Sequence, residues 1–195
     1  MPIFGSTPMG DQIDVVALIR DVFLRRGADS YLGEAVTMSE HMLQAAALAD
    51  AEGADDALVA AALLHDVGLY VDEFSAYSAN DKFDKQHDVV GAELLAPYFD
   101  SRVVAAVRLH VAAKRYLCAT RPEYAAQLSD ASVHTLSLQG GPMSSVEVAE
   151  FEKIAGFGDS VRVRMWDDRA KVPRVPTKSF DEYVPLLLRN LRIAN

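Results

Sequence analysis

The chain has 195 residues, of which half are hydrophobic and about a quarter are charged. This is the composition of a globular protein, and the length is that of one domain of ordinary size. The formal net charge of −9 excludes a nucleic-acid-binding surface, because such a surface needs clustered positive charge. We therefore expect a single domain over residues 1–195 with no nucleic-acid partner.

The N-terminus and the cysteine content bear on the compartment. Residues 1–8 lack a basic segment followed by an apolar stretch, so no signal peptide is expected. No apolar run approaches the roughly 20 residues of a membrane span. The one cysteine, Cys118, has no partner for an intramolecular disulfide, which favours a reducing compartment. We expect a cytoplasmic protein without a membrane partner, and the sequence specifies no oligomeric state.

Apolar residues recur at helical spacing along most of the chain, and no segment alternates with the period of a strand. The predicted helices span residues 13–26, 42–52, 57–65, 87–95, 102–114, 123–138, a stretch that opens at 145, and 180–191. Asp55 or Asp56 is expected to cap the third of these helices and Ser101 the fifth. Residues 70–86 are predicted to form a loop or broken helix, a short arm covers 1–11, and an extended tail begins near 172. The predicted fold class is all-α, a helical bundle.

One predicted helix end carries chemistry that packing does not require. The apolar run 60–64 ends in His65 and Asp66, with glycine at 68. An imidazole is a directional nitrogen ligand, and the carboxylate beside it can bridge two metal ions. Three further histidines lie at or near the ends of predicted helices: His41, His87 and His110.

Each histidine taken alone is more often a core or surface residue with a satisfied hydrogen bond. Four of five at helix ends in one helical domain favour a shared metal site, built from side chains on facing helices. The fifth, His134, we interpret as structural or surface. Mixed imidazole and carboxylate ligands suit zinc, iron or manganese, and ligand softness alone does not choose among them.

His41, the His65-Asp66 pair and the aspartate of Met-Trp-Asp at 165–167 resemble the HD-domain superfamily, whose usual members are metal-dependent phosphohydrolases. Longer strings are Tyr-Leu-Gly-Glu at 31–34, His-Val-Ala-Ala-Lys-Arg-Tyr-Leu at 110–117, Leu-Ser-Asp-Ala-Ser at 128–132 and Gln-Gly-Gly-Pro-Met at 139–143. They resemble the oxidative branch, the di-iron 1-hydroxyphosphonate dioxygenases, which are distant relatives of myo-inositol oxygenase. The match covers about residues 29–173.

The resemblance implies six metal ligands: His41, His65, Asp66, His87, His110 and Asp167. It implies that Asp66 bridges two irons, and the Trp-Asp order selects Asp167 over its neighbour Asp168. The implied cofactor is a mixed-valent Fe(II)/Fe(III) pair, with O2 as co-substrate. In the family a tyrosine occupies an iron position before substrate and oxygen arrive, and a nearby glutamate acts with it. These catalytic positions fall on Tyr31 and Glu34.

Lys114, Arg115 and Ser132 are candidates for binding a phosphonate. Lysine offers three donors and a positive charge, and serine offers a hydroxyl, so both suit a tetrahedral dianion. A basic pair near a helix end is more often a solvated face. By family position Lys114 and Ser132 are the expected binders, with Arg115 as a further candidate.

The expected substrate depends on Leu69. In the members that act on 2-amino-1-hydroxyethylphosphonate, a histidine at this position helps to recognise the amine. A desolvated primary ammonium needs acceptors, whereas a trimethylammonium group prefers apolar and aromatic walls. The favoured activity is therefore oxygen-dependent cleavage of the C–P bond of 1-hydroxy-2-(trimethylammonio)ethylphosphonate, giving glycine betaine and phosphate. The alternatives are the 2-amino substrate giving glycine and phosphate, an HD-type phosphohydrolase, and a non-catalytic ligand-binding module.

Overall fold

The computed structural model describes residues 14–70 and 82–192. Its helices are α1 (Val15–Arg26), α2 (Met38–Ala51), α3 (Asp56–Leu64), the 3-10 helix η1 (Val67–Tyr70), α4 (His87–Leu95), α5 (Ser101–Thr120), α6 (Pro122–Ala125), α7 (Asp130–Leu138), α8 (Ser145–Phe151), α9 (Phe157–Arg169) and α10 (Phe180–Arg189). Over these residues β structure is limited to two isolated bridges. The predicted all-α fold is confirmed. Within the described ranges, no helix combines the length and apolar character that crossing a membrane requires.

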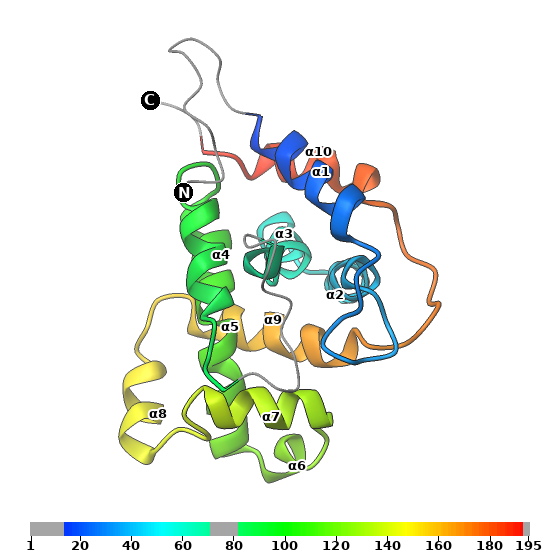
Figure 1. The fold of residues 1–195 in the computed structure, drawn as a ribbon. Helices are drawn as coiled ribbons and strands as arrows, with labels where there is room; N and C mark the ends of the chain where they lie inside the picture. The colour runs from blue at the N-terminus through cyan, green and yellow to red at the C-terminus, as the bar shows by residue number, and fades with distance from the viewer. Residues whose placement is uncertain (1–13, 71–81, 193–195) are drawn as a thin grey trace.

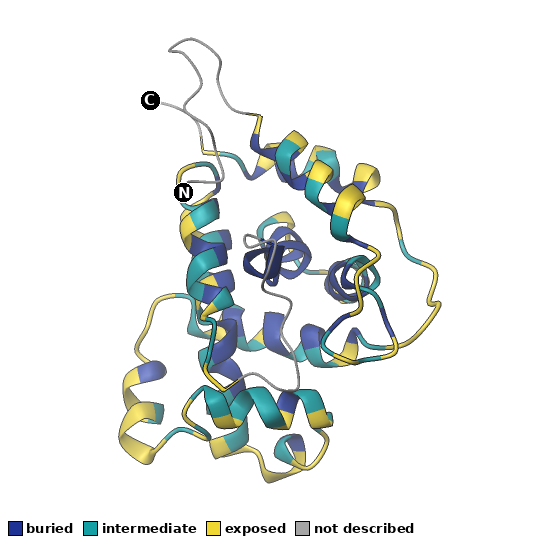
Figure 2. Cartoon of the chain, in the orientation of Figure 1, coloured by how far each residue is buried: buried dark blue, intermediate teal, exposed yellow. Residues whose placement is uncertain are grey.

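The bundle is built around α3. Its residues from Leu58 to Leu64 are at most 1% exposed, as expected for a helix that is apolar on every side. Helices α2, α5, α9 and α10 all pack against it, and Figures 1 and 2 show it enclosed by them and buried beyond its first two residues. Because α3 is enclosed, its C-terminal end delivers His65 and Asp66 into the interior of the protein.

The 20 residues of α5 form the longest described helix, and α9 packs along it. Towards the C-terminal end of α5, Figure 1 shows α6, α7 and α8 grouped below the main bundle. Helices α6 and α8 pack against α5, and Lys114 of α5 donates a hydrogen bond to Thr135 of α7. The group carries Ser132, on α7, close to the part of α5 that carries Lys114, as the contacts described below show.

Several predicted boundaries are wrong. The expected helix 123–138 is two helices, because the side chain of Ser129 accepts a hydrogen bond from the Ser132 backbone N–H and starts a new helix at Asp130. The fifth predicted helix continues to Thr120, and its cap is Asp100 in place of Ser101. His110 therefore lies in mid-helix, not near a helix end as predicted.

Other expectations agree with the structure. Asp55 caps α3 by accepting from the Leu58 backbone N–H, and α4 has the predicted bounds. The second predicted helix begins four residues early, at Met38, and the last ends at Arg189. The N-terminal arm 1–11 and most of the predicted loop, residues 71–81, lie outside the described residues.

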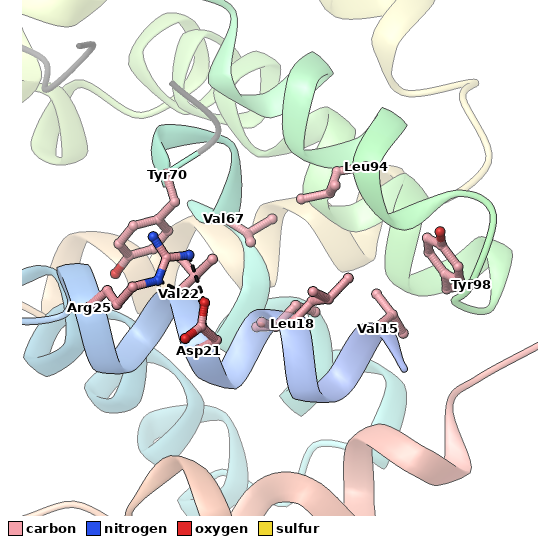
Figure 3. Close-up of a pocket in the computed structure, with 10 residues that line it drawn as sticks. Val15, Leu18, Asp21, Val22, Arg25, Val67, Tyr70, Leu94 and Tyr98 are labelled. Atoms are coloured by element: carbon pink, nitrogen blue, oxygen red, sulfur yellow. Dashed lines mark hydrogen bonds and ion pairs between the residues drawn. The ribbon is translucent and has the colours of Figure 1, made fainter. Parts of the chain in front are cut away.

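A surface groove of about 160 Å³ lies between α1, η1 and α4. Figure 3 shows its walls, mainly apolar side chains such as Leu18, Val67 and Leu94. At one end Arg25 donates to Asp21 at 2.7 Å. No histidine lines this groove, so it is separate from the residues expected to bind metal.

Candidate metal centre

The six predicted ligands come from four helices and the turn after α3. His41 lies in the first turn of α2, His65 and Asp66 follow α3, His87 is the first residue of α4, His110 is in mid-α5, and Asp167 is in the last turn of α9. The side chain of His87 is 12% exposed, and the others are at most 3% exposed. The structure brings all six together in the interior.

The start of α2 is fixed by a capping box. The Thr37 hydroxyl accepts from the Glu40 backbone N–H at 3.2 Å, and the Glu40 carboxylate accepts from the Thr37 backbone N–H at 2.8 Å. This pairing satisfies two backbone donors that a helix start otherwise leaves open. The next residue is His41, so the cap sets where its imidazole enters the site.

Gly68 allows α4 to approach the His65-Asp66 turn. A Cβ atom at this position would lie 2.0 Å from the His87 carbonyl oxygen and 2.7 Å from the Gly91 backbone nitrogen. Both are backbone atoms, which cannot rotate away, so no side chain fits between η1 and α4. The glycine of the His-Asp motif thus has a packing reason: it lets His87 reach Asp66.

Asp66 lies between two pairs of histidines. Its Oδ2 atom is 3.5 Å from His41 Nε2 and 3.4 Å from His65 Nε2. Its Oδ1 atom is 3.2 Å from His87 Nε2 and 3.6 Å from His110 Nε2. Each carboxylate oxygen therefore serves its own pair, which is the arrangement of a bridge between two ions.

Hydrogen bonds through Nδ1 fix three of the rings. They join His41 to the Ala170 carbonyl oxygen at 2.9 Å, His65 to that of Ala62 at 2.8 Å, and His110 to that of Val107 at 2.7 Å. A carbonyl oxygen can only accept, so Nδ1 carries the proton and Nε2 of the neutral ring keeps its lone pair. The Nε2 atoms of His41 and His65 are 3.0 Å apart. Two lone pairs at this distance repel each other unless a cation, either a proton or a metal ion, is shared between them.

Asp167 completes the group around His41 and His65. Its Oδ1 atom is 3.4 Å from His41 Nε2 and 3.8 Å from His65 Nε2. Its Oδ2 atom forms an ion pair with Arg164, whose Nη1 atom lies 2.8 Å away. Arg164 also pairs with Asp168 and donates to the Tyr124 hydroxyl at 3.1 Å. This buried guanidinium orients the Asp167 carboxylate so that Oδ1 faces the histidines.

The electrostatics of the buried carboxylates fit a cation site. Burial opposes the charge of both carboxylates. The neighbouring His65 nevertheless holds the pKa of Asp66 well below its usual range, and Arg164 together with His65 does the same for the pKa of Asp167. The same two carboxylates outweigh burial at His65 and raise its pKa to about 9. Asp66 Oδ2 and Asp167 Oδ1 are buried without a hydrogen-bond partner. A buried anionic oxygen of this kind is costly unless a cation pairs with it.

Two overlapping groups can hold metal: His41, His65 and Asp66, and then Asp66, His87 and His110. Within each group the ligand atoms lie no more than 4.8 Å from one another. Imidazole nitrogens with carboxylate oxygens form the donor set of first-row transition ions. The residues therefore fit a pair of ions that share Asp66.

Tyr31 and Glu34 lie beside the first group. The Tyr31 ring stacks on His41 with ring centroids 3.8 Å apart and planes 15° apart. Burial, and then the negative charges of Asp66 and Asp167, raise the pKa of the Tyr31 hydroxyl. The turn to Glu34 passes through left-handed backbone at Leu32 (φ 50°) and Gly33 (φ 80°). After this turn the Glu34 carboxylate lies 3.7 Å from Lys171 Nζ.

The predicted phosphonate ligands Lys114, on α5, and Ser132, on α7, are both buried and both form hydrogen bonds with side chains around α7. Lys114 is 2% exposed, and its Nζ donates to Thr135 Oγ1 at 2.8 Å. Ser132 is 6% exposed, and its Oγ accepts from Lys171 Nζ at 2.9 Å. Two ammonium groups and two hydroxyls thus meet on one face of α7.

Comparison with known proteins decides the family. The HD-domain family model matches residues 38–134. The chain is 46% identical over 176 residues, 90% of each chain, to the 1-hydroxy-2-(trimethylamino)ethylphosphonate dioxygenase (glycine-betaine-forming) of Leisingera caerulea. It is 43% identical over 155 residues to the hydroxymethylphosphonate dioxygenase of Gimesia maris, covering 79% of this chain and 77% of the relative. This chain belongs to the HD-domain hydroxyphosphonate dioxygenases.

Arg115 and Leu69, the other two residues predicted to bind the substrate of this dioxygenase, have different neighbours from Lys114 and Ser132. Arg115 donates to the Gly141 carbonyl oxygen at 2.8 Å and pairs with Glu147 at 2.7 Å. These contacts tie the loop 139–143 and α8 to α5 and favour a bracing role, so its contact with phosphonate stays a prediction. Leu69 is 5% exposed and lines a cavity of about 20 Å³ together with residues that include Leu32, Met38 and Tyr70. Its role in selecting the substrate also stays a prediction.

Four residues near the dioxygenase site were missed from the sequence: Thr135, Gln139, Arg164 and Lys171. Thr135 and Gln139 share the helical face of Ser132 by their spacing of three and seven residues, and both polar atoms of the Gln139 amide are buried without a partner. Arg164 precedes Asp167 by one helical turn, which is a readable signal for an ion pair. Lys171 follows the end of α9 and has no such signal.

Proposed function

We propose that the protein cleaves the C–P bond of 1-hydroxy-2-(trimethylammonio)ethylphosphonate with O2, giving glycine betaine and phosphate. The observation that carries the proposal is a buried cluster of four imidazoles and two carboxylates, with Asp66 between two pairs of histidines, beside a cluster of lysines and hydroxyls. The relative from Leisingera caerulea, whose name states this reaction, supports the choice of substrate. A phosphate ester hydrolase consumes water and needs no O2, so dependence on O2 separates the two chemistries.

The cofactor that we propose is a mixed-valent Fe(II)/Fe(III) pair. His41, His65, Asp66 and Asp167 would hold the first ion, and Asp66, His87 and His110 the second. When bound, such a pair supplies the activation of O2 and the oxidation of the substrate at C1. Arg164 keeps Asp167 ionised and oriented, and the backbone carbonyls fix the histidine tautomers that leave Nε2 free to bind metal.

Lys114 and Ser132 would bind the phosphonate, joined by Thr135 and the unpaired amide of Gln139. Charged and neutral donors that converge on one dianion give both affinity and orientation. Tyr31 would cover the metal centre before the substrate arrives, and Glu34 would attract the cationic end of the substrate. Leu69 and its apolar neighbours would exclude water around the methyl groups.

Product analysis with three substrates tests the proposal. The purified protein is incubated with the trimethylammonio, 2-amino and unsubstituted hydroxymethyl phosphonates, in air and without oxygen, and phosphate and the carbon product are quantified. We expect oxygen-dependent release of phosphate, with the highest kcat/KM for the trimethylammonio substrate and two irons per chain. Phosphate release without oxygen would refute an oxygenase. A preference for hydroxymethylphosphonate would favour the activity named for the relative from Gimesia maris. We also propose a cytoplasmic location, which fractionation of the native host would test.

A further inference from the structure

Lys171 is a buried cation that the proposed function has not yet used. Its side chain is 13% exposed, and its Nζ donates to Ser132 Oγ at 2.9 Å. The same Nζ lies 3.7 Å from Glu34 Oε1 and 3.8 Å from Asp168 Oδ1. One ammonium group thus connects the glutamate expected at the cationic end of the substrate with the serine expected at the anionic end.

The backbone on both sides of Lys171 is held in place. The preceding carbonyl oxygen, of Ala170, accepts from His41 Nδ1 at 2.9 Å. The following residue, Val172, is paired twice with the Gln44 amide, at 2.8 and 3.1 Å. Both partners are on α2, so the Cα of Lys171 is anchored to the helix that carries His41. The ammonium group can therefore move only by rotation of its own side chain.

Glu34 is incompletely paired in this arrangement. Its Oε1 atom is buried without a hydrogen-bond partner, and the 3.7 Å separation from Lys171 is an ion-pair distance longer than a hydrogen bond. A buried carboxylate in this state gains from any cation that approaches more closely. The contact between Lys171 and Glu34 is thus one that a cationic ligand can replace.

The anion side of the site needs a second positive charge. Burial, and then the charge of Arg164, lower the pKa of Lys114 to about 7, so this ammonium is only partly charged at neutral pH. The Arg164 guanidinium is already paired with Asp167 and Asp168. Lys171 can supply this second charge, because its ammonium group already donates to Ser132 of α7.

We propose that Lys171 is a specificity-determining residue that neutralises Glu34 in the free protein and binds the phosphonate when the substrate is present. The inference rests on the proposed function. The quaternary ammonium of the substrate takes the place of Lys171 at Glu34, and the Lys171 ammonium turns fully to the phosphonate and Ser132. A substrate that carries both charges pairs with Glu34 through its ammonium group and with Lys171 through its phosphonate. A ligand with only the anion leaves Glu34 without its cation.

Steady-state kinetics of K171M test the role in affinity. Methionine keeps the length and apolar stem but removes the charge. We expect KM for the trimethylammonio substrate to rise tenfold to a hundredfold, as for the loss of a charged hydrogen bond, with kcat within about threefold and the iron content unchanged. K171R, which keeps the charge, restores most of the affinity. The control K153M removes an exposed lysine paired with Glu150 on α8 and leaves KM unchanged.

Binding of inorganic phosphate, measured by calorimetry on the iron-loaded protein, is independent of turnover. K171M should bind phosphate at least tenfold more weakly than the wild type, and E34Q more tightly, because it frees Lys171 for the anion. Wild-type phosphate affinity in K171M, or an equal loss in K171R and K171M at unchanged melting temperature, would overturn the inference. If the wild type binds phosphate through Lys171 but cleaves no hydroxyphosphonate, the proposed function fails while the anion site stands.

Discussion

The two halves of the metal centre share Asp66 but are built differently. The first half gathers His41, His65 and Asp167 around Asp66 Oδ2, and all of these side chains are at most 3% exposed. Among the residues that the structure describes, His87 and His110 surround Asp66 Oδ1 in the second half, and His87 is 12% exposed. An ion in the first half would have four protein ligands and one in the second would have three. The second half therefore keeps more coordination positions for water, oxygen or substrate.

The halves also differ in what holds them. His41 follows a capping box, and Asp167 is clamped by the buried Arg164. His87 begins a helix whose preceding residue, Gln86, has left-handed backbone (φ 52°) and no side-chain cap. Its position depends on the close crossing of η1 and α4 at Gly68. The tighter half is thus fixed mainly by side-chain contacts and the more open half by backbone packing.

Replacing Asp66 by alanine should have the largest effect, because one carboxylate serves both halves. We expect both metals to be lost and turnover to fall below detection, and metal analysis by mass spectrometry measures the first effect. The control Asp181→Ala removes an exposed carboxylate paired with Arg20 and should keep both ions. Retention of two metals in Asp66→Ala would show that the halves do not share this ligand.

Gly68→Ala should separate the halves. The new Cβ would lie 2.0 Å from the His87 carbonyl oxygen, so α4 must move, at a cost of about 1–3 kcal/mol or more in stability. We expect about one metal per chain, with the ion around His41 retained, and a lower melting temperature. The control Gly158→Ala, whose Cβ would meet no atom within 4 Å, should leave metal content unchanged. Two tightly bound ions in Gly68→Ala would contradict the packing argument.

The sequence predicted which six side chains would meet better than it predicted the helices that carry them. The residue types and the family resemblance identified all six side chains that the structure brings together, because ligand chemistry limits the choice to few residues. Sequence periodicity placed His110 near a helix end, whereas α5 continues to Thr120. Nothing in the local pattern around 114 stops a helix, so the predicted end there had no physical basis.

The surroundings of the substrate were harder to predict because they depend on tertiary contacts. Lys171 meets Glu34 and Ser132 from positions far apart in the chain, and no spacing rule joins them. The break before α7 was readable in principle, since Ser129 is a good N-cap residue. Arg115 looked like an anion ligand from its charge, but its contacts with Gly141 and Glu147 depend on where the loop folds.

Lys114→Met should weaken substrate binding and leave both halves of the metal centre intact. Lys114 contacts Thr135 and none of the metal ligands, so iron content should not change. A charged hydrogen bond to a buried anion contributes about 1.5–3 kcal/mol, so KM should rise roughly tenfold to a hundredfold. Michaelis–Menten kinetics with parallel metal analysis measure both quantities. Loss of iron, or an unchanged KM, would remove Lys114 from the anion site.

The pH dependence of substrate capture should report on the same lysine. Burial and the positive charges of Arg164 and Lys171 lower the pKa of Lys114 to about 7, while Asp167 and Asp168 act in the opposite direction. Above this pH the free protein loses the ammonium that binds the phosphonate, so kcat/KM should fall about fiftyfold between pH 7 and pH 9. In Lys114→Arg the charge persists across this range, and the alkaline decline should disappear. A decline of the same size in both proteins would assign it to another group.

Leu69→His should have the smallest effect, on the choice between substrates. Leu69 packs beside Leu32, Met38 and Tyr70 around a cavity of about 20 Å³, room for about one water molecule. An imidazole there offers an acceptor to a primary ammonium, whose N–H groups are otherwise stripped of water, and gives nothing to a trimethylammonium group. We expect the ratio of kcat/KM for the trimethylammonio over the 2-amino substrate to fall about tenfold, or about 1.4 kcal/mol. Leu69→Met, which keeps this position apolar, should preserve the ratio, and competition between the two substrates in one reaction measures it directly. An unchanged ratio in Leu69→His would mean that the cationic end lies elsewhere, and Glu34 alone would then have to attract it.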